Sequence, residues 1–316
     1  MRAGPRRLID VVLRGNGGGI ETLLLENGER LSADLYIDCS GSAALLIQGA
    51  LQTGYEDWSR FLPCDRAIAW SSPKIELRMP CSRKTAHAAG WRWSVPMQHR
   101  TGHGHVYSSR FPDDADIQRT LNVEKAEPRS HTFLNGRRSK MWNGNCVALG
   151  AAAGFLEPLE ATDTYLVQSG ISRLLKLLPG PGSSRANEDE YNRLAAIETE
   201  QIRDFLVLHY CSSARRGSPF WDYCRGMELP DSLAARIELF KSRGRVVPYG
   251  GEAFSLPNWL AIFCGMNVLP RRHHPFADKI GVAELTRRSE AIHAAVRQAA
   301  NSMPDHRSFL ARTCAA

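Results

Sequence analysis

The sequence lacks the long apolar runs, cysteine pairs and lysine-rich clusters that mark several classes of protein. No apolar stretch in its 316 residues approaches the roughly 20 residues of a membrane span. The arginines near Met1 are followed by no apolar core, so a signal peptide is not predicted. The 8 cysteines never form a C-x-x-C pair, which favours small apolar residues in a reducing compartment over disulfides. We therefore expect a soluble, cytoplasmic protein with no membrane association.

The charge of the chain does not by itself identify a binding partner. The net charge of +7 is spread along the chain, with many arginines in pairs. Because no RNA-binding signature or lysine-rich run accompanies it, no nucleic-acid partner is predicted. The histidines at 99, 103 and 105 lack the spacing of a metal site, so we expect no bound metal.

The order of predicted elements is that of an α/β protein with a helical C-terminal third. Three strands in a meander are expected at residues 8–13, 20–25 and 33–39, and others at 65–70, 91–95, 105–111 and 146–150. Helices are expected at residues 164–178, 187–210, 230–244 and 278–301. Asn187 with Glu190 predicts a capping box at the start of the second of these helices.

The most informative stretch is ALGAAAGFLEPLEAT at residues 148–162. Small residues between a strand end and a helix start let the backbone approach a ligand closely, and the helix start favours an anion or a flavin edge. Such turns also occur for packing alone. This stretch by itself leaves both interpretations open.

Other stretches extend the pattern over nearly the whole chain. GWRWSVP at 90–96 matches a W-x-W-x-I-P signature with Val95 for isoleucine, and ADLYIDCSG at 33–41 matches the strand-end motif of two-domain FAD enzymes. Further matching words are GYEDW at 54–58, LPCDRA at 62–67, QHRTG at 98–102, GFLEPLE at 154–160 and SPFWDYCR at 218–225. Together they resemble the flavin-dependent (tryptophan) halogenase family.

The resemblance implies an activity and partners. In that family reduced FAD, supplied by a separate flavin reductase, reacts with oxygen to a flavin hydroperoxide. Chloride or bromide then gives hypohalous acid, which reaches a lysine and halogenates an electron-rich aromatic ring such as indole. We thus expect FADH2 as cofactor, and a small aromatic substrate and a reductase as partners, with homodimer formation left open.

The resemblance also assigns roles to residues. By motif, Glu160 is the acid near the substrate that orients the halogenating species or helps remove the ring proton. The remaining roles are flavin contact for Gly41, Gly150, Ala151 and Thr164, halide binding for Thr162 and Asp163, and shielding of flavin and substrate for Trp91 and Trp93. Glu160 could instead complement the helix dipole, and the two tryptophans could simply pack in the core.

The chain departs from the family pattern in several places. No G-x-G-x-x-G opens it, since the glycine run at 15–19 resembles a hairpin loop, and no lysine precedes Lys74 to match the family's lysine. Asp163 stands where a small residue is usual, and its carboxylate could repel halide and cap the helix itself. The sequences SAA at 42–44 and GMN at 265–267 also differ from the motifs usual in the family.

We therefore expect a FAD-dependent monooxygenase/halogenase-like fold with an incomplete Rossmann-type FAD domain. Its predicted parts are FAD-domain remnants at 1–50 and 141–180, a sheet-rich substrate section at 51–140 and a helical section at 181–316. We expect the chain as given to be inactive. The alternatives are a non-catalytic remnant of such an enzyme and a flavin-dependent aromatic hydroxylase.

Overall fold

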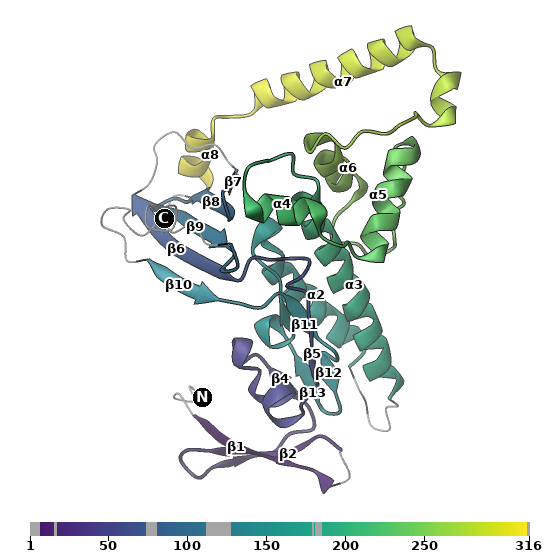
Figure 1. Cartoon of the computed structure of the whole chain (residues 1–316). Helices are drawn as coiled ribbons and strands as arrows, with labels where there is room; N and C mark the ends of the chain where they lie inside the picture. Colours follow the sequence, from purple (N-terminus) through teal and green to yellow (C-terminus); the bar gives the residue numbers. More distant parts are fainter. Residues whose placement is uncertain are drawn as a thin grey trace.

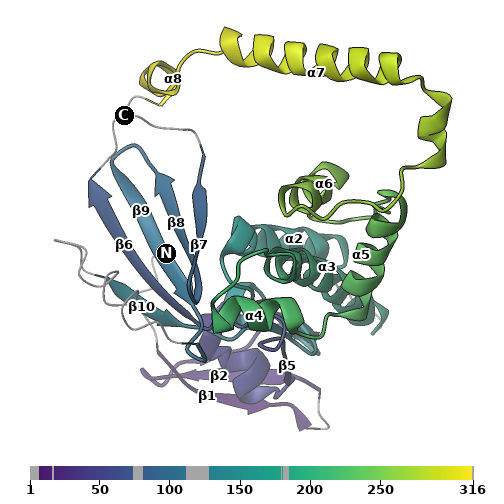
Figure 2. The ribbon, with the colours of Figure 1, turned by 45° about the horizontal axis from the view of Figure 1, so that its top comes forward.

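The computed structural model describes residues 7–15, 18–73, 81–111, 128–178, 180 and 185–314. Met1, Lys74 and part of the glycine run, which entered the sequence analysis, lie outside these residues. Two bodies of secondary structure stand side by side, a five-stranded antiparallel sheet and a group of helices (Figure 2).

The five-stranded sheet comes from the middle of the chain, and its strand order is β10-β6-β9-β8-β7. Its strands are β6 (Arg66–Pro73), β7 (Arg83–His87), β8 (Gly90–Pro96), β9 (Arg100–Tyr107) and β10 (Arg129–Thr132). In the β7–β8 pairing Lys84 lies opposite Trp93, and Ala86 lies opposite Trp91. Side chains two residues apart point to the same face of a strand, so both tryptophans and Lys84 share one face.

Smaller sheets carry the N-terminal part and the segment before the first long helix. A meander joins β1 (Leu8–Leu13), β2 (Ile20–Leu25) and β3 (Arg30–Leu31). A second sheet has the order β14-β11-β5, with β5 (Tyr55–Asp57), β11 (Gly136–Arg138) and β14 (Gly154–Phe155). A third has the order β12-β13-β4, with β4 (Tyr36–Asp38), β12 (Trp142–Asn143) and β13 (Cys146–Ala148). In it β13 and β4 are parallel, which is the pairing that a Rossmann-type domain uses.

Short helical turns connect these strands, and longer helices follow them. The turns are η2 (Gly41–Ala43), η3 (Leu45–Ala50), η4 (Gly150–Ala152), η5 (Leu159–Ala161) and η6 (Pro275–Lys279). The helices are α2 (Thr162–Lys176), α3 (Ala186–Cys211), α4 (Pro219–Gly226), α5 (Asp231–Arg243), α6 (Leu256–Gly265), α7 (Val282–Ser302) and α8 (His306–Thr313). Helix α7 stands away from the other helices and leads to α8 near one end of the large sheet (Figure 1).

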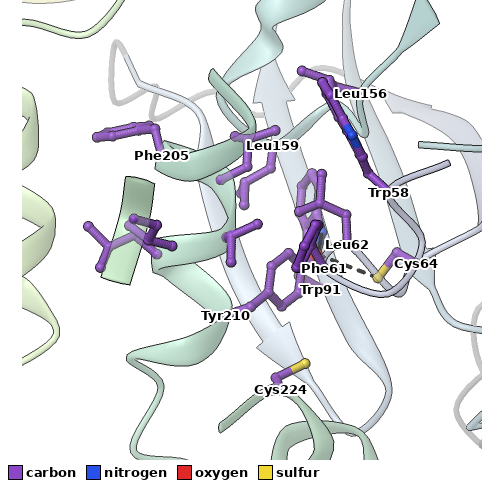
Figure 3. Packing of buried hydrophobic residues seen from close by; sticks show 14 of the residues in the cluster. Trp58, Phe61, Leu62, Cys64, Trp91, Leu156, Leu159, Phe205, Tyr210 and Cys224 are labelled. Carbon is purple, nitrogen blue, oxygen red and sulfur yellow. Dashed lines mark hydrogen bonds between the residues drawn. The ribbon is translucent and has the colours of Figure 1, made fainter. Parts of the chain in front are cut away.

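The main core lies between the large sheet and the C-terminal half of α3. Aromatic side chains dominate it, among them Trp58, Phe61, Trp91, Phe205 and Tyr210 (Figure 3). Each such ring removes a large apolar area from water on folding, so this cluster is the main source of stability. It also fixes the end of α3 against β8, which positions the candidate site.

Most predicted elements are confirmed, but two details are wrong. The meander's third strand is β3, whereas β4, within the predicted strand at 33–39, pairs with β13 instead. The capping box at Asn187 does not form: α3 starts one residue earlier, and the Asn187 amide donates to the Leu177 carbonyl. Helices α4, α6 and α8 were not predicted.

Candidate functional site

The segment between β14 and α2 contains an unusual backbone turn. Glu160 and Ala161 both have left-handed conformations, with φ of 66° and 54°. Residues other than glycine rarely adopt this region, and such conformations persist only where the surroundings enforce them. The turn directs the Glu160 side chain away from the path of the helix that begins at Thr162.

Glu157, three residues earlier, anchors this turn in the core. Its carboxylate accepts hydrogen bonds from the Tyr210 hydroxyl and from Trp91 Nε1, the latter at 3.3 Å. Its backbone N–H donates to Asn135 Oδ1 at 2.7 Å. The side chain is 0% exposed, and this burial raises the pKa of Glu157 to about 7 although both hydrogen bonds act against the rise. Cys64 adds a contact, with its Sγ 3.4 Å from the Tyr210 hydroxyl.

Glu160 has different surroundings. Its Oε1 lies 2.7 Å from Lys84 Nζ on β7 and 3.7 Å from His209 Nε2 near the end of α3. The side chains of Lys84 and Glu160 are 30% and 31% exposed. Glu160 is therefore a carboxylate that a cation holds within reach of solvent. The Lys84 contact is more specific than a general helix-dipole role, although the two are compatible.

The two tryptophans of β8 differ in their environments. Trp91 is 4% exposed and belongs to the main core, where its indole N–H is hydrogen-bonded. Trp93 is half-buried and lies flat against β9, so that a Cβ added at Gly104 would stand 2.2 Å from its Nε1. The glycine at 104 thus makes room for the Trp93 ring. Core packing explains Trp91, and Trp93 also faces a cavity.

That cavity has a volume of about 570 Å³. Trp93, Phe133 and Phe155 supply aromatic walls, and Gln48 and Arg138 supply a polar end, where Arg138 Nη1 donates to Gln48 Oε1 at 2.8 Å. Pro158, two residues before Glu160, is also in its wall. An apolar space with aromatic walls and a polar end suits a three-ring isoalloxazine.

The residues expected to contact flavin lie around this cavity and a neighbouring one. Ser42, next to Gly41, and Ala151 line the larger cavity. Gly150, Ala151 and Thr164 line a second cavity of about 230 Å³ beside α2. The structure brings η2, which contains Gly41, into contact with η4, which contains Gly150 and Ala151. Gly150 has φ of 62°, a conformation that glycine adopts without strain.

The expected halide residues lie at the start of α2. Thr162 is 3% exposed, and its buried hydroxyl has no hydrogen-bond partner, so it has a donor to offer to an anion. Asp163 lines the smaller cavity and keeps contact with solvent, and partial loss of hydration there raises its carboxyl pKa to about 6. The expectation that Asp163 caps α2 is wrong, because its carboxylate accepts no hydrogen bond from the amides of that first turn. Thr162 fits a halide, whereas an ionised Asp163 opposes one.

Sequence patterns did not indicate Lys84, His209, Glu157 or Tyr210. Lys84 stands 76 positions before its partner Glu160, in no recognisable motif. Glu157 lies inside the GFLEPLE word, where its complete burial was the missing information. Cys64 belongs to this network, and all eight cysteines have free thiols in the structure.

Two kinds of feature are missing from the part of the chain that the structure describes. No helix there has the length and apolarity to span a bilayer. Within the same residues, no three histidine, cysteine or acidic side chains gather as metal ligands would.

Comparison with known proteins places this geometry in one group of enzymes. The family model for tryptophan halogenase matches residues 5–281. The chain is 33% identical to the tryptophan 7-halogenase KtzQ of Kutzneria sp. strain 744 over 89% of its own length and 57% of that relative's. Its structure is similar to Xcc4156, a flavin-dependent halogenase from Xanthomonas campestris, with a TM-score of 0.92, 42% identity and coverage of 97% of this chain and 63% of that one. BrvH, a flavin-dependent halogenase from Brevundimonas sp. BAL3, gives a TM-score of 0.91 at 39% identity, with coverage of 97% and 64%. The chain thus spans less than two thirds of the length of each of these relatives.

Proposed function

Since the chain belongs to the tryptophan halogenase family, we propose that it serves FADH2-dependent halogenation of an electron-rich, tryptophan-like aromatic compound. The observation that carries this proposal is the placement of Glu160. It extends from a left-handed turn next to Pro158 and binds Lys84, which lies opposite the cavity-lining Trp93. Glu160 is thus linked to the proposed flavin cavity in two ways. Pro158, two residues before it, lines the cavity, and its partner Lys84 lies opposite Trp93, which also lines it.

The cavity of about 570 Å³ is the proposed position of the flavin ring, with Ser42, which follows Gly41, and Ala151 in its wall. Bound there, reduced FAD would supply the reducing equivalents that activate oxygen. Trp93 would cover the ring and limit the access of water, while Trp91 holds β8 in place from the core side. A separate flavin reductase is the proposed supplier of FADH2.

Thr162 and Glu160 are the proposed halide and acid groups. The unpartnered Thr162 hydroxyl would donate to chloride or bromide. Glu160, held by Lys84, would orient the halogenating species or accept the ring proton as aromaticity is restored. Asp163 would weaken halide binding where its carboxyl is ionised, above its pKa of about 6.

Binding of reduced FAD to the purified chain tests the cavity. Gly104→Ala should weaken this binding, because the new methyl group would displace Trp93. Gly250→Ala is the matched control, since a methyl group there meets no atom within 4 Å. Equal affinity in the two variants would place the flavin elsewhere.

Product analysis separates the alternatives. A halogenated product that requires halide supports the proposal. An oxygenated product formed without halide would instead identify a flavin-dependent hydroxylase. Absence of both flavin binding and product would identify a non-catalytic remnant.

A further inference from the structure

His209 has a defined tautomer. It lies on α3 one turn after Phe205, and its Nδ1 is 2.9 Å from the Phe205 carbonyl oxygen. A carbonyl oxygen only accepts hydrogen bonds, so Nδ1 must carry a proton and donate it. In the neutral imidazole the other nitrogen, Nε2, therefore presents a lone pair.

That lone pair is buried and faces Glu160. The His209 side chain is 12% exposed, and its Nε2 has no hydrogen-bond partner. The nearest acidic oxygen is Glu160 Oε1 at 3.7 Å, which is beyond a hydrogen bond. An acceptor that faces a carboxylate can bond to it only after one of the two has gained a proton.

Two charged groups act on His209 from other elements, and they oppose each other. Glu160, from η5, raises the pKa of His209, and Lys84, from β7, lowers it. Burial is the largest influence and keeps the pKa of His209 below its ordinary value. The lowered pKa favours the neutral form of His209, in which Nε2 carries the lone pair.

We propose that His209 is a positioning residue that acts through Glu160, because its Nε2 takes over the proton that Glu160 collects and so restores the carboxylate beside Lys84. The source of that proton rests on the proposed function. The ring C–H bond of the halogenated intermediate breaks, its electron pair returns to the ring, and the proton goes to Glu160. The carboxyl O–H bond then breaks as an N–H bond forms at Nε2. The proton returns to water by the same path, since Glu160 is 31% exposed.

Lys84 explains why the proton would move on. The Lys84 ammonium group lies 2.7 Å from Glu160 Oε1, so the two groups form an ion pair whenever Glu160 is a carboxylate. Transfer to His209 gives an imidazolium next to a carboxylate that still has its lysine. Glu160 thus accepts the proton first, and His209 then holds it.

Nitrogen NMR of the histidine-labelled chain tests the proposal without any need for catalysis. At pH 8 the wild-type His209 should show a protonated Nδ1 and a lone pair on Nε2, and acidification should protonate Nε2. Glu160→Gln should move this transition to lower pH, because the favourable negative charge is lost. Lys84→Met should move it to higher pH, because a repulsive positive charge is lost.

Arg83→Met is the matched control for the lysine variant. Arg83 is adjacent on β7, and the alternation of side chains along a strand directs it to the opposite face. Its removal should leave the His209 transition in place. A proton on Nε2 at pH 8, or a transition that Glu160→Gln leaves unmoved, would overturn the proposal. Because this readout needs no flavin or halide, failure of the proposed function would not affect it.

Discussion

Glu157 and Glu160 stand three residues apart in one short segment, yet they have opposite environments. Glu157 is 0% exposed, has its pKa raised to about 7 and accepts hydrogen bonds from two core aromatic side chains. Glu160 is 31% exposed and forms an ion pair with Lys84. The left-handed turn at Glu160 separates the two, since it directs one carboxyl away from the core while the other stays inside.

This difference teaches how the site is built. A buried acid that two core side chains hold through one carboxyl oxygen fixes a backbone segment, but it is closed to solvent. A partly exposed acid that a cation holds in place is available for proton transfer. The strained turn needs the buried anchor, so the two glutamates depend on each other.

The largest expected effect is on catalysis by Glu160→Gln. Loss of a positioned acid or base lowers rates by about 10²- to 10⁴-fold. The rate of halogenated product formation should fall by that amount, while the denaturation midpoint changes little. Glu238→Gln, on the exposed face of α5, is the control, and an equal loss in both variants would contradict a special role for Glu160.

The second-largest expected effect is the pH dependence of the free energy of unfolding that Glu157 causes. The folded protein holds the Glu157 proton up to a pH of about 7, whereas the unfolded chain releases it near 4.5. The free energy of unfolding should therefore fall as pH rises through this window, by about 3 kcal/mol from this group. Glu157→Gln should remove that decline, and denaturant titrations from pH 4 to pH 8 would measure it. A variant that keeps the full decline would show that other groups cause it.

Tyr210→Phe should have a smaller effect on the same anchor. It removes the hydroxyl that donates to Glu157 and accepts from Trp91 Nε1 at 3.0 Å. Loss of a buried hydrogen-bond partner lowers the free energy of unfolding by about 1–3 kcal/mol. Tyr223→Phe, whose hydroxyl donates to an exposed carbonyl, should lower it less in urea denaturation. A larger loss of stability in Tyr223→Phe than in Tyr210→Phe would mean that the hydrogen bonds around Glu157 do not stabilise the fold.

Lys84→Met should change stability least. The ion pair with Glu160 is 30% and 31% exposed on its two sides, and pairs of this kind contribute up to about 1 kcal/mol, less at high salt. Thermal unfolding at low and high salt would measure this contribution. A loss well above that value would place Lys84 in the structural anchor rather than in the site.

The sequence was informative where local pattern decides structure. Helix α5, predicted at residues 230–244, ends at Gly244, which has a left-handed backbone. Tertiary contacts overrode local signals elsewhere. Asn187 bonds the end of α2 instead of capping α3, and β4 pairs with a strand more than 100 positions away.

The candidate site was predictable only in part. The GFLEPLE word located Glu160, and the small residues at 150–153 located a cavity wall. Lys84 and His209 come from β7 and α3, and only folding brings them to Glu160. No periodicity or spacing in the sequence predicts contacts between residues so far apart, so Lys84 and His209 were not predicted as site residues.

The most direct test of the account is the mass of the product that the chain forms from tryptophan with reduced FAD, oxygen and bromide. Any product should have one bromine in place of one hydrogen and should disappear when bromide is omitted. A product that contains added oxygen and forms equally without bromide would contradict the proposed halogenation.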